Sequence, residues 1–249
     1  MIKGICKYCG QEKELINSHI IPKNLCQIDK NGPMVGIDSL TKTFDHNPIH
    51  QNGAKAYLLC KECDNLLGKL DRYGSKVFKK IIPNHKWDIV DGVELCKLLP
   101  DEVDYWTLKK FLISVLWRAS VDKNGPDLGR YENIALKILK EELPDNSNYF
   151  VPFVYILDTK TPLDFSMGIF GNKTLGKHIY IIHFPHYEVM IIPSAEHSRD
   201  PKLMELYKAL FNCNHIIVQK FSIPTLIDQQ LINTLKICQK NELQKKKKL

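Results

Sequence analysis

Apolar residues recur at helical spacing in several stretches of the chain, and each such stretch predicts a helix. The expected helices cover residues 64–80, 103–121, 131–143, 201–211 and 225–239. Other short runs are dense in Ile, Val, Phe, Leu and Tyr, as the strands of a sheet are. The expected strands cover residues 14–21, 56–59, 150–157, 179–184, 189–192 and 215–221. Strands and helices do not alternate strictly, so we expect an α+β fold.

The character of the chain changes around residues 80–90. The residues before this point are rich in turn formers, cysteine and charge, whereas longer apolar patterns follow it. We therefore expect a small domain over residues 1–85, a larger mixed α+β domain over residues 86–240 and a basic tail over residues 241–249. Between Lys23 and Gly53 the pattern predicts a loop, and we expect a loop of this length to be functional or partly mobile.

The composition is that of a globular protein with a substantial core. The chain has 249 residues, of which 44% are hydrophobic and 25% charged, which excludes a mainly disordered or collagen-like chain. No apolar run approaches the length of a membrane span, and the N-terminus has no apolar secretion signal. We therefore expect a cytoplasmic protein that has no membrane partner.

The net charge of +7 is unevenly distributed. Residues 1–85 carry 13 Lys and Arg against 8 Asp and Glu, whereas residues 86–240 carry 18 against 19. The tail adds four lysines against one glutamate. This asymmetry indicates a polyanionic partner for the first segment, and improved solubility is the alternative explanation.

Four of the eight cysteines form two CxxC pairs, Cys6 with Cys9 and Cys60 with Cys63. In a reducing compartment, paired cysteines indicate a metal site more often than a disulfide. Four thiolates on two tight turns can surround a structural Zn²⁺ tetrahedrally, and Gly10 permits the left-handed residue that such a turn needs. Two chance or redox CxxC motifs are the alternative. The remaining cysteines are expected to be small buried side chains. They are Cys26, Cys96, Cys213 and Cys238.

Between the CxxC pairs stands the stretch Asn17-Ser18-His19-Ile20-Ile21-Pro22-Lys23, and a helix follows the second pair. The order of cysteine turn, strand with histidine, loop, strand, cysteine turn and helix resembles the HNH (ββα-metal) endonucleases. The resemblance covers about residues 1–80. The match is closest to a group of bacterial proteins that share CxxC, SHIIPK and LLCxxC motifs and a helix similar to residues 111–120, and it extends there to about residue 125.

The resemblance implies a zinc-stapled ββα module, followed here by the larger α+β domain. It also implies a metal-dependent hydrolase that cuts phosphodiester bonds of DNA or RNA, and fold-level analogy suggests defence against foreign nucleic acid. His19 would be the general base, because imidazole titrates near neutral pH. A core-facing His19 that hydrogen-bonds across the hairpin is the alternative.

The resemblance further implies a catalytic Mg²⁺ or Mn²⁺. We expect Asp64 and His50 as its ligands and Asn52 as the catalytic asparagine. Ser18 and Asp64 depart from the family pattern, which commonly has Asp before the histidine and a second histidine after the last cysteine. Asp64 could instead cap the helix. Asp71 is expected to be a surface charge, with a second metal-binding carboxylate as the alternative.

Lys23, Lys55 and Lys61 are expected to contact phosphates without reading the base sequence. Trp117 is expected in the core, with Arg118 paired to a carboxylate. The departures from the family pattern keep a second function open, in which an inactive zinc module recognises nucleic acid or a protein. In a third interpretation, residues 1–85 have only a structural role and the rest of the chain carries the function. Residues 86–240 could also contact a second copy of the chain or a partner protein.

Overall fold

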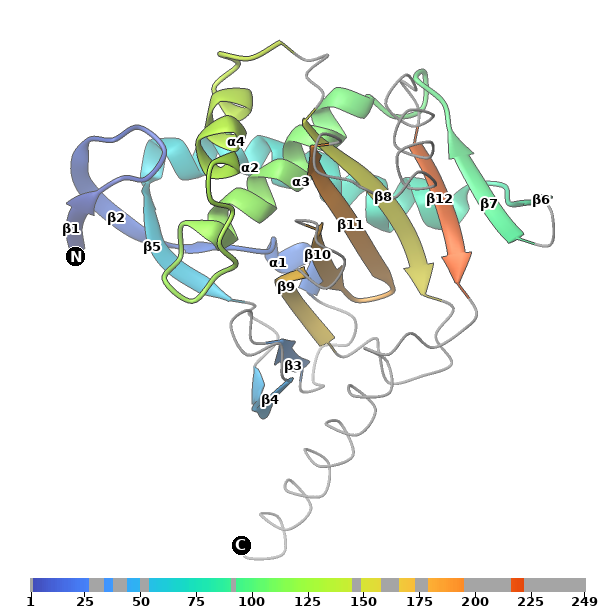
Figure 1. The fold of residues 1–249 in the computed structure, drawn as a ribbon, viewed down its shortest axis with the longest axis horizontal. Helices are drawn as coiled ribbons and strands as arrows, with labels where there is room; N and C mark the ends of the chain where they lie inside the picture. Colours follow the sequence, from blue (N-terminus) through green and yellow to red (C-terminus); the bar gives the residue numbers. More distant parts are fainter. Residues whose placement is uncertain are drawn as a thin grey trace, which may run out of the picture.

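The structure is a computed structural model. It describes residues 2–26, 34–37, 44–49, 54–90, 93–144, 149–157, 166–172, 179–194 and 216–221. Helices and strands are mixed along the chain, which confirms the α+β class (Figure 1). Among the described residues, no helix combines the length and the apolar character that crossing a membrane requires.

The first sheet has three antiparallel strands in the order β1-β2-β5. These are β1 (Ile2–Ile5), β2 (Glu12–His19) and β5 (Lys55–Cys60). The register between β2 and β5 places His19 opposite Lys55, after an irregularity between Ile16 and Asn17. The amide of Ile20 then donates to the carbonyl of Ala54 (2.9 Å), so the pairing extends one residue past His19.

The second sheet has nine strands in the order β4-β3-β9-β10-β11-β8-β12-β7-β6. They are β3 (Met34–Ile37), β4 (Phe44–Ile49), β6 (Asp88–Val90), β7 (Val93–Leu98), β8 (Tyr149–Leu157), β9 (Ser166–Asn172), β10 (Ile179–Phe184), β11 (Tyr187–Ser194) and β12 (Ile216–Phe221). Every residue of β10 is buried, which explains its nearly unbroken apolar sequence. Predicted strands 150–157, 179–184, 189–192 and 215–221 are confirmed within two residues at each end.

The predicted loop between Lys23 and Gly53 is wrong in the described part of that segment. Residues Lys23–Cys26 form the short helix α1, and β3 and β4 lie at one edge of the nine-stranded sheet. β3 pairs in parallel with β9, more than 120 residues later in the chain. Such non-local pairing leaves no signature in the local pattern of residues 34–37 and 44–49.

Helix α2 (Lys61–Lys76) follows β5 without a break. It begins at Lys61 with Cys60 as its N-cap, so the alternative that Asp64 caps the helix is wrong. Cys60 already has the extended backbone conformation of an N-cap, because it is the last residue of β5. At its other end, α2 continues as a π-helical turn (Val77–Ile81) and a 3-10 turn (Ile82–Asn84).

Helix α3 (Tyr105–Ser120) is buried on nearly all sides, as its mostly apolar sequence predicts. Its N-cap Asp104 accepts hydrogen bonds from the amides of Trp106 and Thr107, at 3.0 and 3.2 Å. Helix α4 (Tyr131–Leu139) ends four residues earlier than expected, and Glu141 beyond it has a positive φ of 61°. Trp117 of α3 is 1% exposed, which confirms the prediction that it lies in the core.

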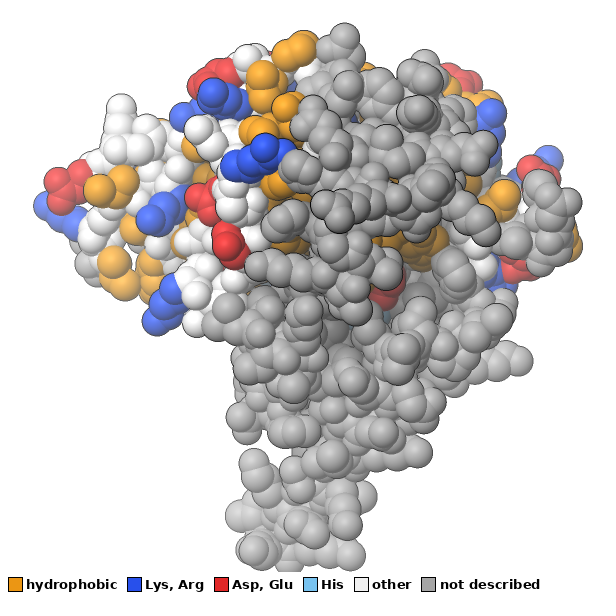
Figure 2. All heavy atoms as spheres, viewed as in Figure 1, with side chains coloured by type: hydrophobic (Ala, Val, Ile, Leu, Met, Phe, Trp, Pro, Cys, Tyr) orange, Lys and Arg blue, Asp and Glu red, His pale blue; other side chains and the backbone are white. Residues whose placement is uncertain are grey.

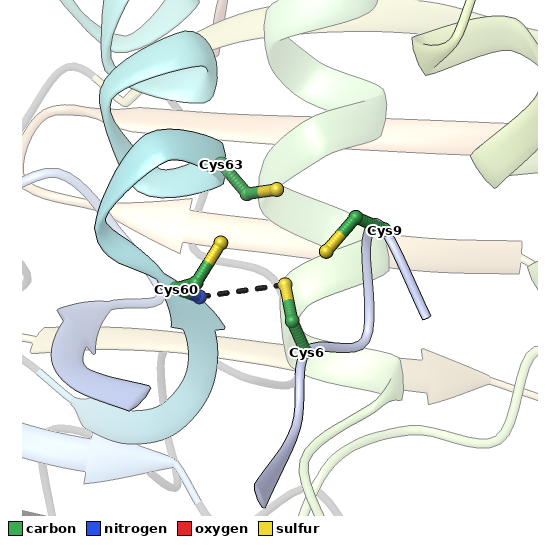
Figure 3. Close-up of side chains that lie close together, drawn as sticks. All are labelled: Cys6, Cys9, Cys60 and Cys63. Atoms are coloured by element: carbon green, nitrogen blue, oxygen red, sulfur yellow. Dashed lines mark hydrogen bonds between the residues drawn. The ribbon is translucent and has the colours of Figure 1, made fainter. Parts of the chain in front are cut away.

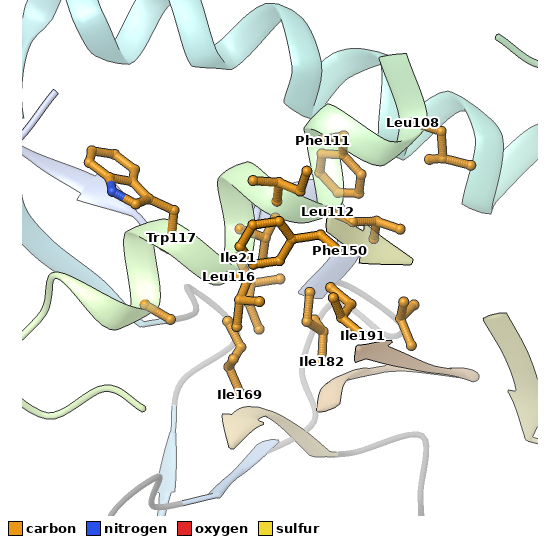
Figure 4. Packing of buried hydrophobic residues seen from close by; sticks show 14 of the residues in the cluster. Ile21, Leu108, Phe111, Leu112, Leu116, Trp117, Phe150, Ile169, Ile182 and Ile191 are labelled. Atoms are coloured by element: carbon orange, nitrogen blue, oxygen red, sulfur yellow. The ribbon is translucent and has the colours of Figure 1, made fainter. Parts of the chain in front are cut away.

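One hydrophobic core includes residues from both sides of position 85. Figure 4 shows Ile21 of the first segment gathered with Leu112 and Leu116 of α3 and with Phe150, Ile182 and Ile191 of the second sheet. The Tyr8 hydroxyl also donates to the carbonyl of Leu139 at 3.0 Å. The two segments therefore pack closely, and their division into separate domains at residue 85 stays a prediction.

The predicted helices 201–211 and 225–239, the basic tail, Cys213 and Cys238 lie outside the described residues. Cys26 and Cys96 are fully buried, which confirms that prediction for these two. The Cys26 thiol donates to the carbonyl of Pro22 at 3.3 Å. Burial raises the pKa of Cys26 to about 12 and that of Cys96 to about 11, so both thiols stay neutral near pH 7.

Candidate functional site

The four cysteines of the CxxC pairs lie together, as the sequence predicts (Figure 3). Cys6 and Cys9 are on the turn between β1 and β2, Cys60 ends β5, and Cys63 is in the first turn of α2. The turn is closed by the amide of Gly10, which donates to the carbonyl of Cys6 at 2.8 Å, and Gly10 has a φ of +75°. Only glycine adopts that φ without strain, so the glycine is required by the turn.

The distances fit a tetrahedral metal ion. All four Sγ atoms lie within 4.8 Å of one another. Zinc bound to four thiolates at about 2.3 Å would place the sulfurs about 3.8 Å apart. The cluster therefore needs only a small contraction to hold a structural metal such as Zn²⁺.

The electrostatics of the cluster also favour a cation. Burial alone would raise the pKa of Cys6, but backbone hydrogen bonds from Cys9, Cys60 and Tyr8 outweigh it and lower this pKa to about 7. One of these donors is the amide of Cys60, 3.4 Å from Cys6 Sγ. Burial, followed by hydrogen bonds with Cys60 and Cys6, raises the pKa of Cys63. The cluster thus accommodates one thiolate readily, and a central cation would allow the others to ionise.

A pocket of about 210 Å³ lies along α2, whose first turn also carries Cys63. Residues of β2, of the segment that follows it, of α2 and of α3 line the pocket. They are Asn17, Ser18, His19, Pro22, Lys23, Asn24, Asp64, Gly68, Asp71, Arg72, Ser75 and Arg118. The α2 residues recur every three or four positions, so one face of this helix forms a wall of the pocket.

The pocket contains a buried ion pair between Arg118 and Asp71. Arg118 donates two hydrogen bonds to the Asp71 carboxylate, from Nη1 to Oδ2 (2.9 Å) and from Nη2 to Oδ1 (2.6 Å). Arg118 Nη1 also donates to the carbonyl of His19 (2.9 Å), and Nε donates to the carbonyl of Ser114 (3.3 Å). The prediction that Arg118 pairs with a carboxylate is confirmed, and the prediction that Asp71 is a surface charge is wrong. The cause is that α3 packs against α2 and brings Arg118, 47 residues later in the chain, to Asp71.

Three of the predicted site residues meet in this pocket. His19 is the last residue of β2 and is half-buried, Lys23 is the first residue of α1, and Asp64 is in the fourth position of α2. Lys55 and Lys61 do not line the pocket, but Lys55 is opposite His19 in the first sheet. His50 and Asn52, the other expected metal ligand and the expected catalytic asparagine, lie outside the described residues.

Sequence reasoning missed several pocket residues. Arg72 and Ser75 follow Asp64 at helical spacing, and this spacing after the second CxxC could have identified them. The hydroxyls of Ser18 and Ser75 are buried and have no hydrogen-bond partner among the described residues. Buried polar atoms of this kind are costly, and they are often found where a ligand or water is bound.

Comparison of the chain with protein-family models, with curated proteins and with solved structures gave no match. Any assignment of function therefore depends on the residues and the geometry described above.

Proposed function

We propose that this protein is a metal-dependent, HNH-like endonuclease that hydrolyses phosphodiester bonds of DNA or RNA. The observation that carries the proposal is the pocket in which His19, Asp64 and Lys23 meet, along the helix that also carries Cys63 of the cysteine cluster. The strand that ends in His19 and the helix that carries Asp64 line this pocket, and the strand β5 pairs antiparallel with the first and leads directly into the second. This arrangement supports the family resemblance of residues 1–80.

His19 is the general base of the proposed reaction. Its imidazole takes the proton of the attacking water, which requires a neutral ring near pH 7. Lys23 and Arg72 place positive charge at the pocket and favour the approach of a phosphate. The carboxylate of Asp64 would hold Mg²⁺ or Mn²⁺, which neutralises charge on the phosphate and the leaving oxygen when it is bound.

The cysteine cluster has a structural role in this proposal. Four thiolates around one Zn²⁺ leave no open coordination position, so this metal would not take part in the reaction. The cluster connects the β1–β2 turn to the junction of β5 and α2. It thereby holds the strand of His19 and the helix of Asp64 in a fixed relation.

A second candidate function is recognition of nucleic acid without cleavage. Asp71 is engaged by Arg118, which leaves Asp64 as the pocket carboxylate without an ion pair among the described residues. One carboxylate binds a divalent cation more weakly than two do. The same pocket could therefore bind a phosphate and leave it intact.

A cleavage assay separates the two functions. Plasmid DNA, single-stranded DNA and RNA are incubated with the full-length protein in Mg²⁺, in Mn²⁺ and in EDTA. We expect cleavage that needs the cation and that falls in the His19→Ala variant by a factor on the order of 10² or more. His85→Ala is the matched control, because His85 is half-buried but contacts Glu102 outside the pocket.

Two results would contradict the proposal. Undiminished cleavage by His19→Ala would mean that the active site lies elsewhere. A wild-type protein that binds nucleic acid and cuts none of the substrates would favour recognition without cleavage.

A further inference from the structure

Arg118 joins three elements that meet at the pocket. It belongs to α3, outside the segment that carries the cysteines and His19, and its side chain is only 2% exposed. Its guanidinium contacts Asp71 on α2, the carbonyl of His19 at the end of β2 and the carbonyl of Ser114 on its own helix.

These contacts fix the backbone at His19. On one side of the residue, the amide of Ile20 donates to the carbonyl of Ala54 at 2.9 Å. That amide and the carbonyl of His19 belong to the same peptide group, and this carbonyl accepts from Arg118. The peptide group between His19 and Ile20 therefore has a hydrogen bond at its amide and another at its carbonyl. Together with the pairing of His19 opposite Lys55, this restricts the backbone at His19 and so the range of positions that the imidazole can take.

The guanidinium is itself held in place. Two nearly parallel hydrogen bonds to Asp71 fix its orientation, and the bond to the carbonyl of Ser114 fixes its distance from α3. A lysine ammonium is a point charge without this planar fork, so it cannot reproduce all of these contacts at once. Asp71 thus serves Arg118, and this ion pair would compete with a metal ion for the Asp71 oxygens.

We propose that Arg118 is a positioning residue that sets the imidazole of His19 against the pocket. The inference rests on the proposed function of His19 as general base. It also means that α3, and so the second segment of the chain, completes the site. Residues 1–85 alone would contain the expected catalytic groups without the group that orients them.

The test compares three variants of the full-length protein. Arg118→Lys keeps the positive charge but loses the planar guanidinium. Asp71→Asn keeps a hydrogen-bond acceptor for Arg118. Arg130→Lys is the control, since Arg130 is an exposed arginine outside the pocket. We expect Arg118→Lys to lower kcat by at least about tenfold with KM nearly unchanged, as a displaced catalytic group does. Asp71→Asn should lower kcat by a smaller factor, and Arg130→Lys should have the kcat of the wild type.

A second measurement separates positioning from general stability. The imidazole signals of His19 are assigned in ¹H–¹³C NMR spectra by comparison with His19→Ala. In Arg118→Lys, we expect these signals to shift while those of His85 stay in place, and the zinc content to stay unchanged. This measurement does not need activity, so it tests the inference even if the wild type cleaves nothing and the proposed function fails.

Several results would overturn the inference. Unchanged His19 signals in Arg118→Lys would show that the contact does not orient the ring. A loss of kcat that parallels a loss of folded protein would show a purely structural role. If Asp71→Asn lowered kcat more than Arg118→Lys does, and also raised the Mg²⁺ concentration needed for the half-maximal rate, Asp71 would be a metal ligand instead.

Discussion

Two carboxylates line the pocket, and their surroundings give them different roles. Asp71 accepts two hydrogen bonds from a buried arginine, so its charge is already balanced. Asp64 lies one residue after Cys63 and has no such partner among the described residues. A divalent cation in this pocket would therefore be expected at Asp64 and not at Asp71.

The predicted phosphate contacts of Lys55 and Lys61 can be tested by substitution. Both are exposed, Lys55 opposite His19 and Lys61 at the first position of α2. Replacing both with Ala should weaken binding about equally for unrelated sequences, and the slope of log K against log salt should flatten by about two. Fluorescence anisotropy of labelled DNA and RNA over a salt series measures both effects.

The controls for this prediction come from the rest of the surface. On the face drawn in Figure 2, Lys and Arg side chains of the described residues are interspersed with Asp and Glu. A control is therefore needed for the loss of binding that follows from a lower net charge alone. Lys86 and Lys137 are exposed lysines outside the pocket, and their double Ala variant should retain the salt slope. If that control weakened binding as much, or if a truncation after Lys240 alone abolished it, Lys55 and Lys61 would not be the contacts.

At the scale of elements, α2 and α3 pack so closely that one glycine is required between them. A Cβ on Gly74 of α2 would lie 2.3 Å from the Phe111 ring of α3, which a well-packed core cannot accommodate without a shift. Gly68, six residues earlier, lines the pocket, and a Cβ there would meet only Arg72 Nη1, at 3.9 Å. The two glycines therefore offer a matched comparison on one helix.

Gly74→Ala should destabilise the protein by about 1–3 kcal/mol through overpacking, although alanine favours the helix. Gly68→Ala should instead stabilise it by roughly 0.5–1 kcal/mol, because it gains helix propensity without a clash. Urea unfolding of both variants measures the two free energies of unfolding. Similar effects of the same sign would mean that α2 and α3 are not packed as described.

The elements that could be predicted from the sequence are those with a strong local pattern. β8, β10 and β12 have dense β-branched and aromatic residues, and α3 has apolar residues on nearly every side. β4 and β6 are edge strands of the large sheet, and their short, partly polar sequences do not differ from loops. The start of α2 was misplaced because a cysteine, and not Asp64, takes the N-cap position.

The candidate site was predictable in part for the same reason. The CxxC pairs and His19 are recognisable from spacing and from the family resemblance, and the cysteines do meet in space. Asp71 was misassigned because its partner is 47 residues later, where nothing in the local sequence of α2 points to it. Long-range contacts of this kind decide which carboxylate is free to hold a ligand.

At the scale of the whole molecule, two connections hold the pocket together. The cysteine cluster joins the first sheet to α2, and the common core joins α2 and α3 to the large sheet. Tyr8, between Cys6 and Cys9, reinforces both, since its ring packs edge-on against Trp117 at 5.9 Å. Metal binding at the cluster should therefore contribute to folding of the pocket walls, as metal binding does in structural zinc sites.

The metal content of the purified full-length protein tests this account most directly. The account predicts one Zn²⁺ per chain in the wild type, its loss in Cys60→Ser, and its retention in Cys96→Ala, a buried cysteine outside the cluster. Mass spectrometry of the metal in all three proteins gives the result. A wild type without zinc, or a Cys60→Ser variant that keeps all of it, would contradict the claim that these four cysteines hold the pocket in place.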